Sequence, residues 1–135
     1  MTFPGNQIAP GLSEFERMAR DAFQALPDLF RERASHVSIR IQDFADADLL
    51  KEMEIDDPFS LSGLYVGVPL TEESVSHPSL HPPEVYLFRR PILDEWASRG
   101  DVALDHLIAH VLIHELGHHF GWSDEAMHKA LDEAD

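Results

Sequence analysis

The longest helical pattern in the chain runs from Asp101 to Phe120, after a break at Gly100. The chain has 135 residues, of which 44% are hydrophobic, and this suits one globular domain with a modest core. A helix of about 20 residues is long for so small a domain. We expect a small twisted sheet to lie beside this helix.

A second helix is predicted near the N-terminus. Residues 1–12 contain two prolines and two glycines, so we expect a flexible N-terminal arm followed by a single domain over residues 13–135. Ser13 and Glu16 have the spacing of a capping box, which predicts that the helix begins there. Pro27 is expected to end or kink it. One side of this helix is predicted to be buried, and it consists of Phe15, Met18, Ala19, Ala22 and Leu26.

Three strands are predicted between these two helices. In residues 36–42, apolar side chains alternate and point inward, as in a half-buried strand. Residues 61–70 are the second strand, and their two glycines indicate a bulge or a close approach by another group. Residues 84–92 are the third strand, which we expect to stop at Pro91. Short helical pieces are expected around Leu49 and near Trp96, and residues 123–134 form a last amphipathic segment. The order helix, strands, helix, helix predicts an α+β fold with a small twisted mixed sheet.

Charge and composition exclude several functions. Ten basic residues against 25 acidic ones give a net charge of −15, and such a surface repels phosphate backbones and anionic lipid headgroups. We therefore expect no nucleic-acid partner and no membrane partner, and solubility alone is a sufficient reason for the acid excess. The chain has no cysteine, so a metal site must use nitrogen and oxygen ligands. The N-terminus has neither a basic region nor an apolar run, which predicts a cytoplasmic protein.

The long helix contains the segment "VLIHELGHHFGWSD". His114 and His118 are four residues apart, so both imidazoles lie on one side of the helix and can meet one ion. Glu115 lies roughly 100° around the axis from His114, where it can act as a base toward a metal-activated water. This spacing gives each residue of the pattern His-Glu-x-x-His a chemical role.

Two residues beyond this pattern strengthen it. Gly121 can end the helix in a left-handed conformation that turns the chain sharply, and Asp124 then lies where a third ligand is needed. Each also has a simpler explanation, because Gly121 is an ordinary helix cap and Asp124 suits the first turn of a following helix. A histidine-rich amphipathic helix without a metal therefore remains the alternative.

The segment "HELGHHFGWSD" and the order of "LSGLYVGVPLT", "LFRRPI" and "HELGHHFG" resemble the small bacterial zincin-like metallopeptidases. The resemblance covers roughly residues 37–124 and implies a minimal zincin-like domain. It makes His114, His118 and Asp124 the ligands of one Zn²⁺ per chain, and Glu115 the catalytic base. It also implies a peptide or protein substrate.

Other polar residues keep more than one interpretation. His110 is at best next to a ligand, His106 is expected to be solvated, and His119 is expected to pack or to bond to the backbone. The donor that would stabilise an oxyanion is open among Tyr65, Tyr86 and His77, and packing in the core or in a strand is the simpler explanation for each tyrosine. Arg89 and Arg90 fit either a solvated strand end or a site for a substrate carboxylate.

Taken together, these patterns predict zinc-dependent hydrolysis of peptide or amide bonds, with an extended substrate paired to residues 84–88 as an edge strand. One alternative is a zinc-binding module of the same fold that cleaves nothing and binds a protein partner. A second alternative is a metal buffer that uses the nine histidines and the acidic surface.

Overall fold

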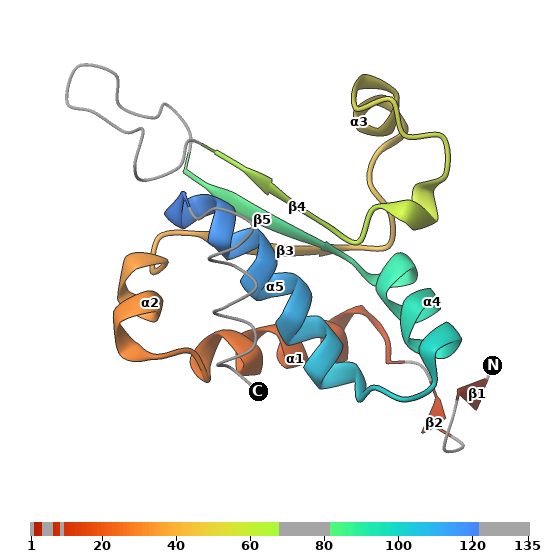
Figure 1. Ribbon diagram of the computed structural model, residues 1–135, viewed down its shortest axis with the longest axis horizontal. Coiled ribbons are helices and arrows are strands. Elements are labelled where there is room, and N and C mark those ends of the chain that lie inside the picture. Colours follow the sequence, from red (N-terminus) through yellow and green to blue (C-terminus); the bar gives the residue numbers. More distant parts are fainter. Residues whose placement is uncertain (1, 4–6, 9, 68–81, 122–135) are drawn as a thin grey trace.

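The computed structural model describes residues 2–3, 7–8, 10–67 and 82–121, with side chains from residue 10 onward (Figure 1). Within these residues the fold is α+β, as predicted. The elements in chain order are β1 (Thr2–Phe3), β2 (Gln7–Ile8), α1 (Leu12–Gln24), α2 (Asp28–Arg33), β3 (Ser38–Gln42), α3 (Ala47–Glu52), the 3₁₀ turn η2 (Pro58–Ser60), β4 (Gly63–Val66), β5 (Glu84–Phe88), α4 (Arg89–Arg99) and α5 (Leu104–Phe120).

The sheet that carries the fold has three strands in the order β3, β5, β4. β3 pairs in parallel with β5, from Ser38 opposite Glu84 to Gln42 opposite Phe88. β4 pairs antiparallel with the other edge of β5, with Gly63 opposite Leu87. The prediction that residues 84–88 form an edge strand is therefore wrong, because both edges of β5 are already hydrogen-bonded. β4 is the edge strand that lies next to α5.

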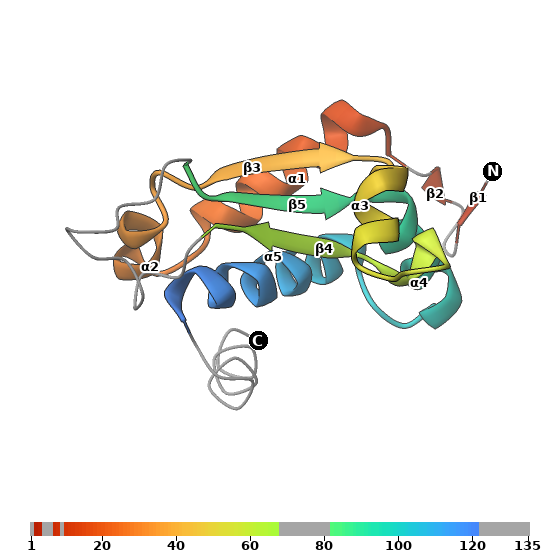
Figure 2. The ribbon, with the colours of Figure 1, turned by 90° about the horizontal axis from the view of Figure 1, so that it is seen from above.

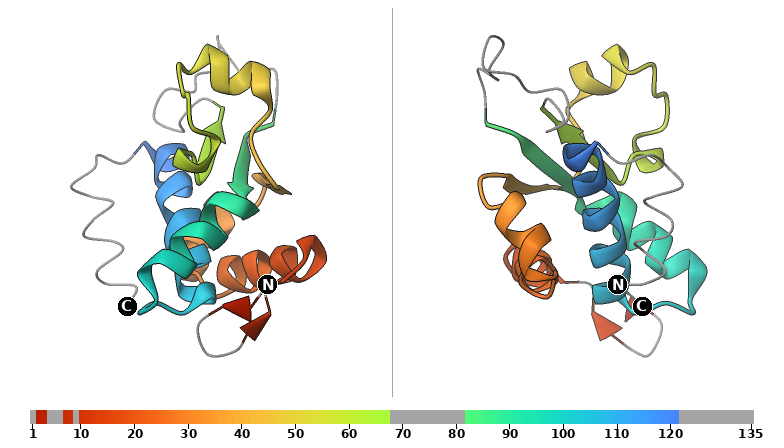
Figure 3. Two further views of the ribbon diagram at one scale, coloured as in Figure 1. Left: turned by 90° about the vertical axis from the view of Figure 1, so that its right-hand side faces the viewer. Right: turned by 60° about the vertical axis from the view of Figure 1, so that its left-hand side comes forward.

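Two helices cover one face of the sheet. Figure 2 shows α1 running along β3 and α5 running along β4, and Figure 3 shows α3 apart from both, beyond the end of β3. Alternation along β5 explains this layering, because Val85 and Leu87 are fully buried against the helices while Tyr86 between them is only half-buried. No helix in the described part of the chain is long and apolar enough to cross a membrane.

The core joins α1, the sheet, α4 and α5 into one cluster. The predicted inward side of α1 is confirmed, since Phe15 and Ala19 are buried and the other three residues pack against the cluster. α5 contributes the largest share, because its apolar residues recur every three or four positions and so lie on one side. Its buried apolar residues are Leu104, Leu107, Ile108, Leu112 and Leu116.

Several element boundaries differ from the sequence prediction. Gly11 caps α1 without a side-chain hydrogen bond, so the predicted capping box at Ser13 is wrong, and Ser13 lies inside the first turn. β5 ends at Phe88 rather than at Pro91, which lies in the first turn of α4. Proline is tolerated there because the first backbone N–H groups of a helix have no partner within it. The N-terminal arm contains two short strands, β1 and β2, that pair antiparallel.

Candidate metal centre

The C-terminal half of α5 carries the predicted site. Its histidines at four-residue spacing lie along the outer side of the helix, where His118 is exposed and His114 is half-buried. Glu115 lies on the inner side and is only 9% exposed. This division follows from the helical period, since one residue corresponds to about 100° of rotation.

The geometry of the two imidazoles suits a shared ion. The ring centroids of His114 and His118 are 5.3 Å apart and the rings are nearly perpendicular, at 86°. Two imidazoles bound to one tetrahedral zinc at about 2.0–2.1 Å would have centroids about 5 Å apart. The separation of the two rings is therefore compatible with one shared zinc ion.

Glu115 is held between α5 and the edge strand β4. A side chain at Gly63 would collide there, because an added Cβ would lie 2.9 Å from Val111 Cγ1 and 3.1 Å from Glu115 Cγ. The missing side chain lets strand and helix approach closely, as the two glycines of this segment predicted. Glu115 Oε1 lies 4.0 Å from His118 Nε2, which is too long for a hydrogen bond.

The buried position of Glu115 changes its acidity. Burial raises the pKa of Glu115 from its ordinary value of 4.5 to about 7, and a hydrogen bond from the backbone N–H of Tyr65 offsets part of that rise. A carboxyl group with a pKa near 7 exchanges a proton readily at neutral pH, which is the property that a general base and acid requires.

Tyr65 also binds the last turn of α5 through its side chain. Its hydroxyl lies 2.8 Å from Nδ1 of His119, which is fully buried, and Nε2 of the same ring lies 3.4 Å from the carbonyl oxygen of Arg33. A carbonyl can only accept, so Nε2 carries the proton, and in the neutral ring Nδ1 accepts from the tyrosine hydroxyl. The expectation that His119 packs or bonds to the backbone is confirmed.

The helix ends where the pattern predicted. Gly121 adopts φ 73° and ψ 25°, the left-handed conformation, and its N–H bonds to the carbonyl of His118. In the described part of the chain, no group of three or more His, Asp or Glu side chains is arranged to hold a metal ion. Asp124, the predicted third ligand, lies outside that part.

A family model of zincin-like metallopeptidases matches residues 34–133 of the chain. This match covers most of the sequence and includes the sheet, α4, α5 and the histidine segment. The chain belongs to the zincin-like metallopeptidase family. A search of curated proteins gave no match. Membership assigns this zincin-like protein to a family of zinc-binding peptidases and bears out the resemblance found in the sequence.

The other predicted residues of this zincin-like protein divide into three groups. His106 and His110 are exposed on the outer side of α5, which agrees with the rotation expected from their spacing. Arg89 is mainly structural, because its guanidinium pairs with Asp43 at 2.7 Å and donates to the carbonyl of Pro10 at 2.9 Å. His77 lies outside the described residues.

Sequence reasoning gave Tyr65 two interpretations, packing and an oxyanion donor; it does pack against the core, but its two polar contacts with α5 were missed. Its backbone N–H reaches Glu115 and its hydroxyl reaches His119. Side chains alternate between the two faces of a sheet, and this places the ring of Tyr86 on the face opposite to Tyr65. There its hydroxyl is 3.4 Å from Glu84. The sequence contained one signal for these contacts. Side chains two residues apart in a strand lie on the same face, so Tyr65 lies on the same face as Gly63, where the helix approaches closely.

Proposed function

We propose that this chain is a zinc-dependent peptidase in which Glu115 is the general base. The observation that carries the proposal is the placement of Glu115, a buried carboxyl with a pKa near 7 beside two histidines whose separation suits one zinc ion. His114, His118 and Asp124 would hold the ion, one per chain. When bound, zinc lowers the pKa of a water molecule and polarises the carbonyl of the scissile bond.

Glu115 supplies the proton transfers. Its carboxylate accepts a proton from the attacking water and then donates it to the leaving amine, which needs a pKa close to the working pH. The backbone N–H of Tyr65 holds the carboxylate against β4, where its Oε1 lies 4.0 Å from Nε2 of His118. The hydroxyl of Tyr65 donates to His119 and Tyr86 lies on the other face of the sheet, so His77 is the candidate oxyanion donor of the three.

An extended peptide would bind along β4. This strand is the edge of the described sheet beside α5, whereas β5 has a neighbour on each side. A peptide added to β4 would gain backbone hydrogen bonds and lie next to Glu115, and this replaces the predicted pairing with residues 84–88.

The test compares the zinc-loaded wild type with Glu115→Gln on a mixed peptide library. Glutamine preserves the size of the side chain but cannot accept the proton, so we expect zinc occupancy to be retained and cleavage to fall at least about 100-fold. Glu52→Gln on the exposed surface of α3 is the matched control and should cleave like the wild type.

Two results would contradict the proposal. Equal cleavage by Glu115→Gln and the wild type would mean a contaminating protease or another mechanism. A fully zinc-loaded wild type that cleaves no member of the library would favour the alternative, a zincin-fold module that binds a protein partner.

A further inference from the structure

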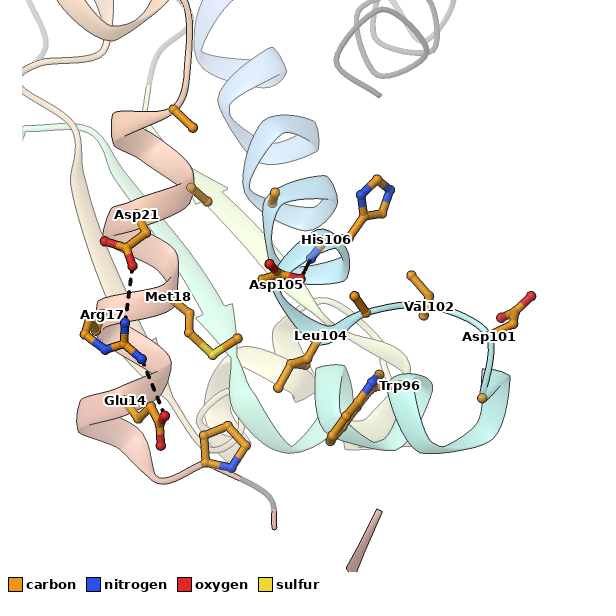
Figure 4. Close-up of a pocket in the computed structure, with 16 residues that line it drawn as sticks. Glu14, Arg17, Met18, Asp21, Trp96, Asp101, Val102, Leu104, Asp105 and His106 are labelled. Carbon is orange, nitrogen blue, oxygen red and sulfur yellow. Dashed lines mark hydrogen bonds and ion pairs between the residues drawn. The ribbon is translucent and has the colours of Figure 1, made fainter. Parts of the chain in front are cut away.

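An open groove lies at the opposite end of α5 from the candidate metal centre. It runs between α1 on one side and the connection from α4 to α5 on the other, and its volume is about 1330 Å³ (Figure 4). Small-molecule sites usually measure about 300–1,000 Å³ and enclose their ligand. The groove is larger than this and open along its length, so it suits a segment of polypeptide.

The floor of the groove is apolar. Figure 4 shows Met18 of α1 facing Leu104 and Trp96 across the groove, with Val102 beside them on the connecting loop. Trp96 belongs to the hydrophobic core, and Met18 and Val102 pack against that core while remaining partly exposed. A ligand lying here would therefore cover the rim of the core with apolar groups of its own.

Carboxylates surround this floor on both sides. Glu14 and Asp21 line the α1 wall, and Asp101 and Asp105 line the opposite wall. Among the described residues that line the groove, Arg17 is the one with a permanent positive charge. Its guanidinium is shared between Glu14 and Asp21 at 3.4 Å each, so it neutralises only part of one wall.

Arg99, which lies outside the groove, changes this balance little. Arg99 approaches Asp101 at 4.0 Å, and the Asp101 side chain is 81% exposed. Exposed pairs of this length contribute almost nothing to stability and leave the carboxylate accessible to another cation. The groove thus combines an apolar floor with walls of net negative charge.

The walls determine the conformation of the occupant. The α1 wall and the start of α5 are helical, so most of their backbone groups are bonded within their own helices, and the loop of residues 100–103 completes the opposite wall. An extended peptide would find few backbone partners along such walls. A helix satisfies its own backbone and can place an apolar stripe on the floor, which is the helix-in-groove mode of recognition.

Charge also distinguishes the possible occupants. A second copy of the chain carries a net charge of −15, and the chain's own residues 122–135 contain five carboxylate side chains and one lysine. Both would add negative charge to walls that are already negative, and like charges in an interface oppose binding. A segment rich in lysine or arginine gains from the same walls.

We propose that this groove is a docking site for a basic amphipathic helix of a partner protein. Leucine-like side chains of that helix lie on the partly exposed Met18 and Val102, and lysine or arginine side chains on its flanks meet Asp21 and Asp101. The site is separate from the candidate metal centre. Docking therefore requires neither zinc nor Glu115, and it goes beyond the proposed peptidase activity.

The experiment measures binding of a fluorescein-labelled helical peptide to the zinc-loaded full chain by fluorescence polarisation. The peptide has about 18 residues, long enough to form a helix, with a leucine stripe flanked by lysines. A second peptide has glutamate in place of each lysine. We expect the lysine peptide to bind and the glutamate peptide to fail, with affinity falling as salt rises from about 50 to 300 mM.

Variants separate the groove from the general negative charge of the chain. The double change Asp21→Lys with Asp101→Lys should weaken lysine-peptide binding at least about tenfold at low salt. The matched control, Glu32→Lys with Glu52→Lys, reverses the charge at two exposed positions on other helices. It should change the affinity for the lysine peptide less than about twofold. Glu115→Gln should bind the peptide like the wild type.

Val102→Asp tests the apolar floor. This change adds negative charge to the groove but removes apolar surface, so it should weaken binding if the floor receives the leucine stripe. Ala25→Asp adds the same charge at an exposed lining position and is the second variant if Val102→Asp unfolds the chain. With Ala25→Asp, the affinity should stay within about threefold and keep its dependence on Asp21 and Asp101.

Four results of the binding experiments would overturn the proposal. These are no binding of the lysine peptide, an equal loss in the Glu32 and Glu52 control, tighter binding by Val102→Asp, and displacement of the probe by a peptide of the chain's own residues 122–135. Self-association that Val102→Asp abolishes would also overturn it, because a second copy would then occupy the groove.

Discussion

Glu115 is buried where α5 packs against the edge strand β4. Its ionisation is therefore coupled to folding. In the folded chain its pKa is about 7, against an ordinary value of 4.5, and burial is the larger cause. The folded state consequently binds the proton more tightly than the unfolded state between these two pH values. The contribution to stability is fully present below about pH 4.5 and is lost as pH rises through 7.

We predict a measurable consequence for the zinc-free chain. The free energy of unfolding of the wild type should fall by about 3 kcal/mol relative to that of Glu115→Gln between pH 4.5 and pH 8. Urea unfolding of both proteins in the presence of a chelator at several pH values measures this difference. Parallel pH profiles for the two proteins would mean that the carboxyl titrates normally.

Tyr65 and Tyr86 provide a second comparison between single residues, because they lie on neighbouring strands and their side chains point to opposite faces of the sheet. Tyr65→Phe removes the hydroxyl that bonds to Nδ1 of the fully buried His119. We predict that the free energy of unfolding falls by about 1–3 kcal/mol, because a buried acceptor loses its donor.

Tyr86→Phe is the matched control. Its hydroxyl makes one long contact of 3.4 Å to Glu84 on the more open face of the sheet, so the expected loss is below about 0.5 kcal/mol. Denaturant unfolding of both variants under the same conditions decides the comparison. Equal losses would show that the Tyr65 hydroxyl does not hold the last turn of α5.

The packing of β4 against α5 depends on a missing side chain. At Gly63 an added Cβ would lie 2.9 Å from Val111 Cγ1 and 3.2 Å from the carbonyl oxygen of Tyr86. We predict that Gly63→Ala lowers the free energy of unfolding by about 1–3 kcal/mol through overpacking and lowers peptide cleavage as β4 shifts from Glu115.

Two further variants check the cause of that effect. Val111→Ala removes the nearest methyl group, so combining it with Gly63→Ala should cost less than the sum of the two single changes. Gly11→Ala, where nothing lies within 4 Å of the added Cβ, should cost no more than a changed helix cap, below about 1 kcal/mol. Strict additivity of Gly63→Ala and Val111→Ala would argue against the close approach.

At the level of the whole chain, one tight zinc site distinguishes a peptidase from a metal buffer. We predict one zinc per chain by elemental analysis, and a loss of affinity of at least about 100-fold by calorimetry for His114→Ala or His118→Ala. His106→Ala with His110→Ala is the matched control, since this pair has the same four-residue spacing on the same helix and is exposed.

The control pair should leave the stoichiometry and the tight affinity unchanged. Several equivalent zinc ions per chain, reduced by the His106 and His110 changes, would support the buffer instead. Bound zinc should also raise the midpoint of thermal unfolding, because a ligand that binds only the folded state stabilises it by mass action.

Local chemistry explains which features the sequence predicted correctly. The C-terminal end of α5, the inward residues of α1 and the left-handed Gly121 depend on helical period and on the steric freedom of glycine, and both act within a few residues. The pattern around His114 and His118 is equally local, so their common side and separation follow from the helix alone. Alternation also predicted the strand of residues 36–42, and the strand predicted over residues 84–92 is observed as the shorter β5.

The remaining features depend on contacts between distant parts of the chain. Alternation shows that a strand exists but not which strands lie beside it, so the central position of β5 could not be read from residues 84–88. The pKa of Glu115 depends on the approach of β4, which begins 52 positions earlier at Gly63 and closes off the solvent. The groove likewise forms only where α1 meets the start of α5, because its two walls are far apart in sequence and are brought together by burial of the shared core.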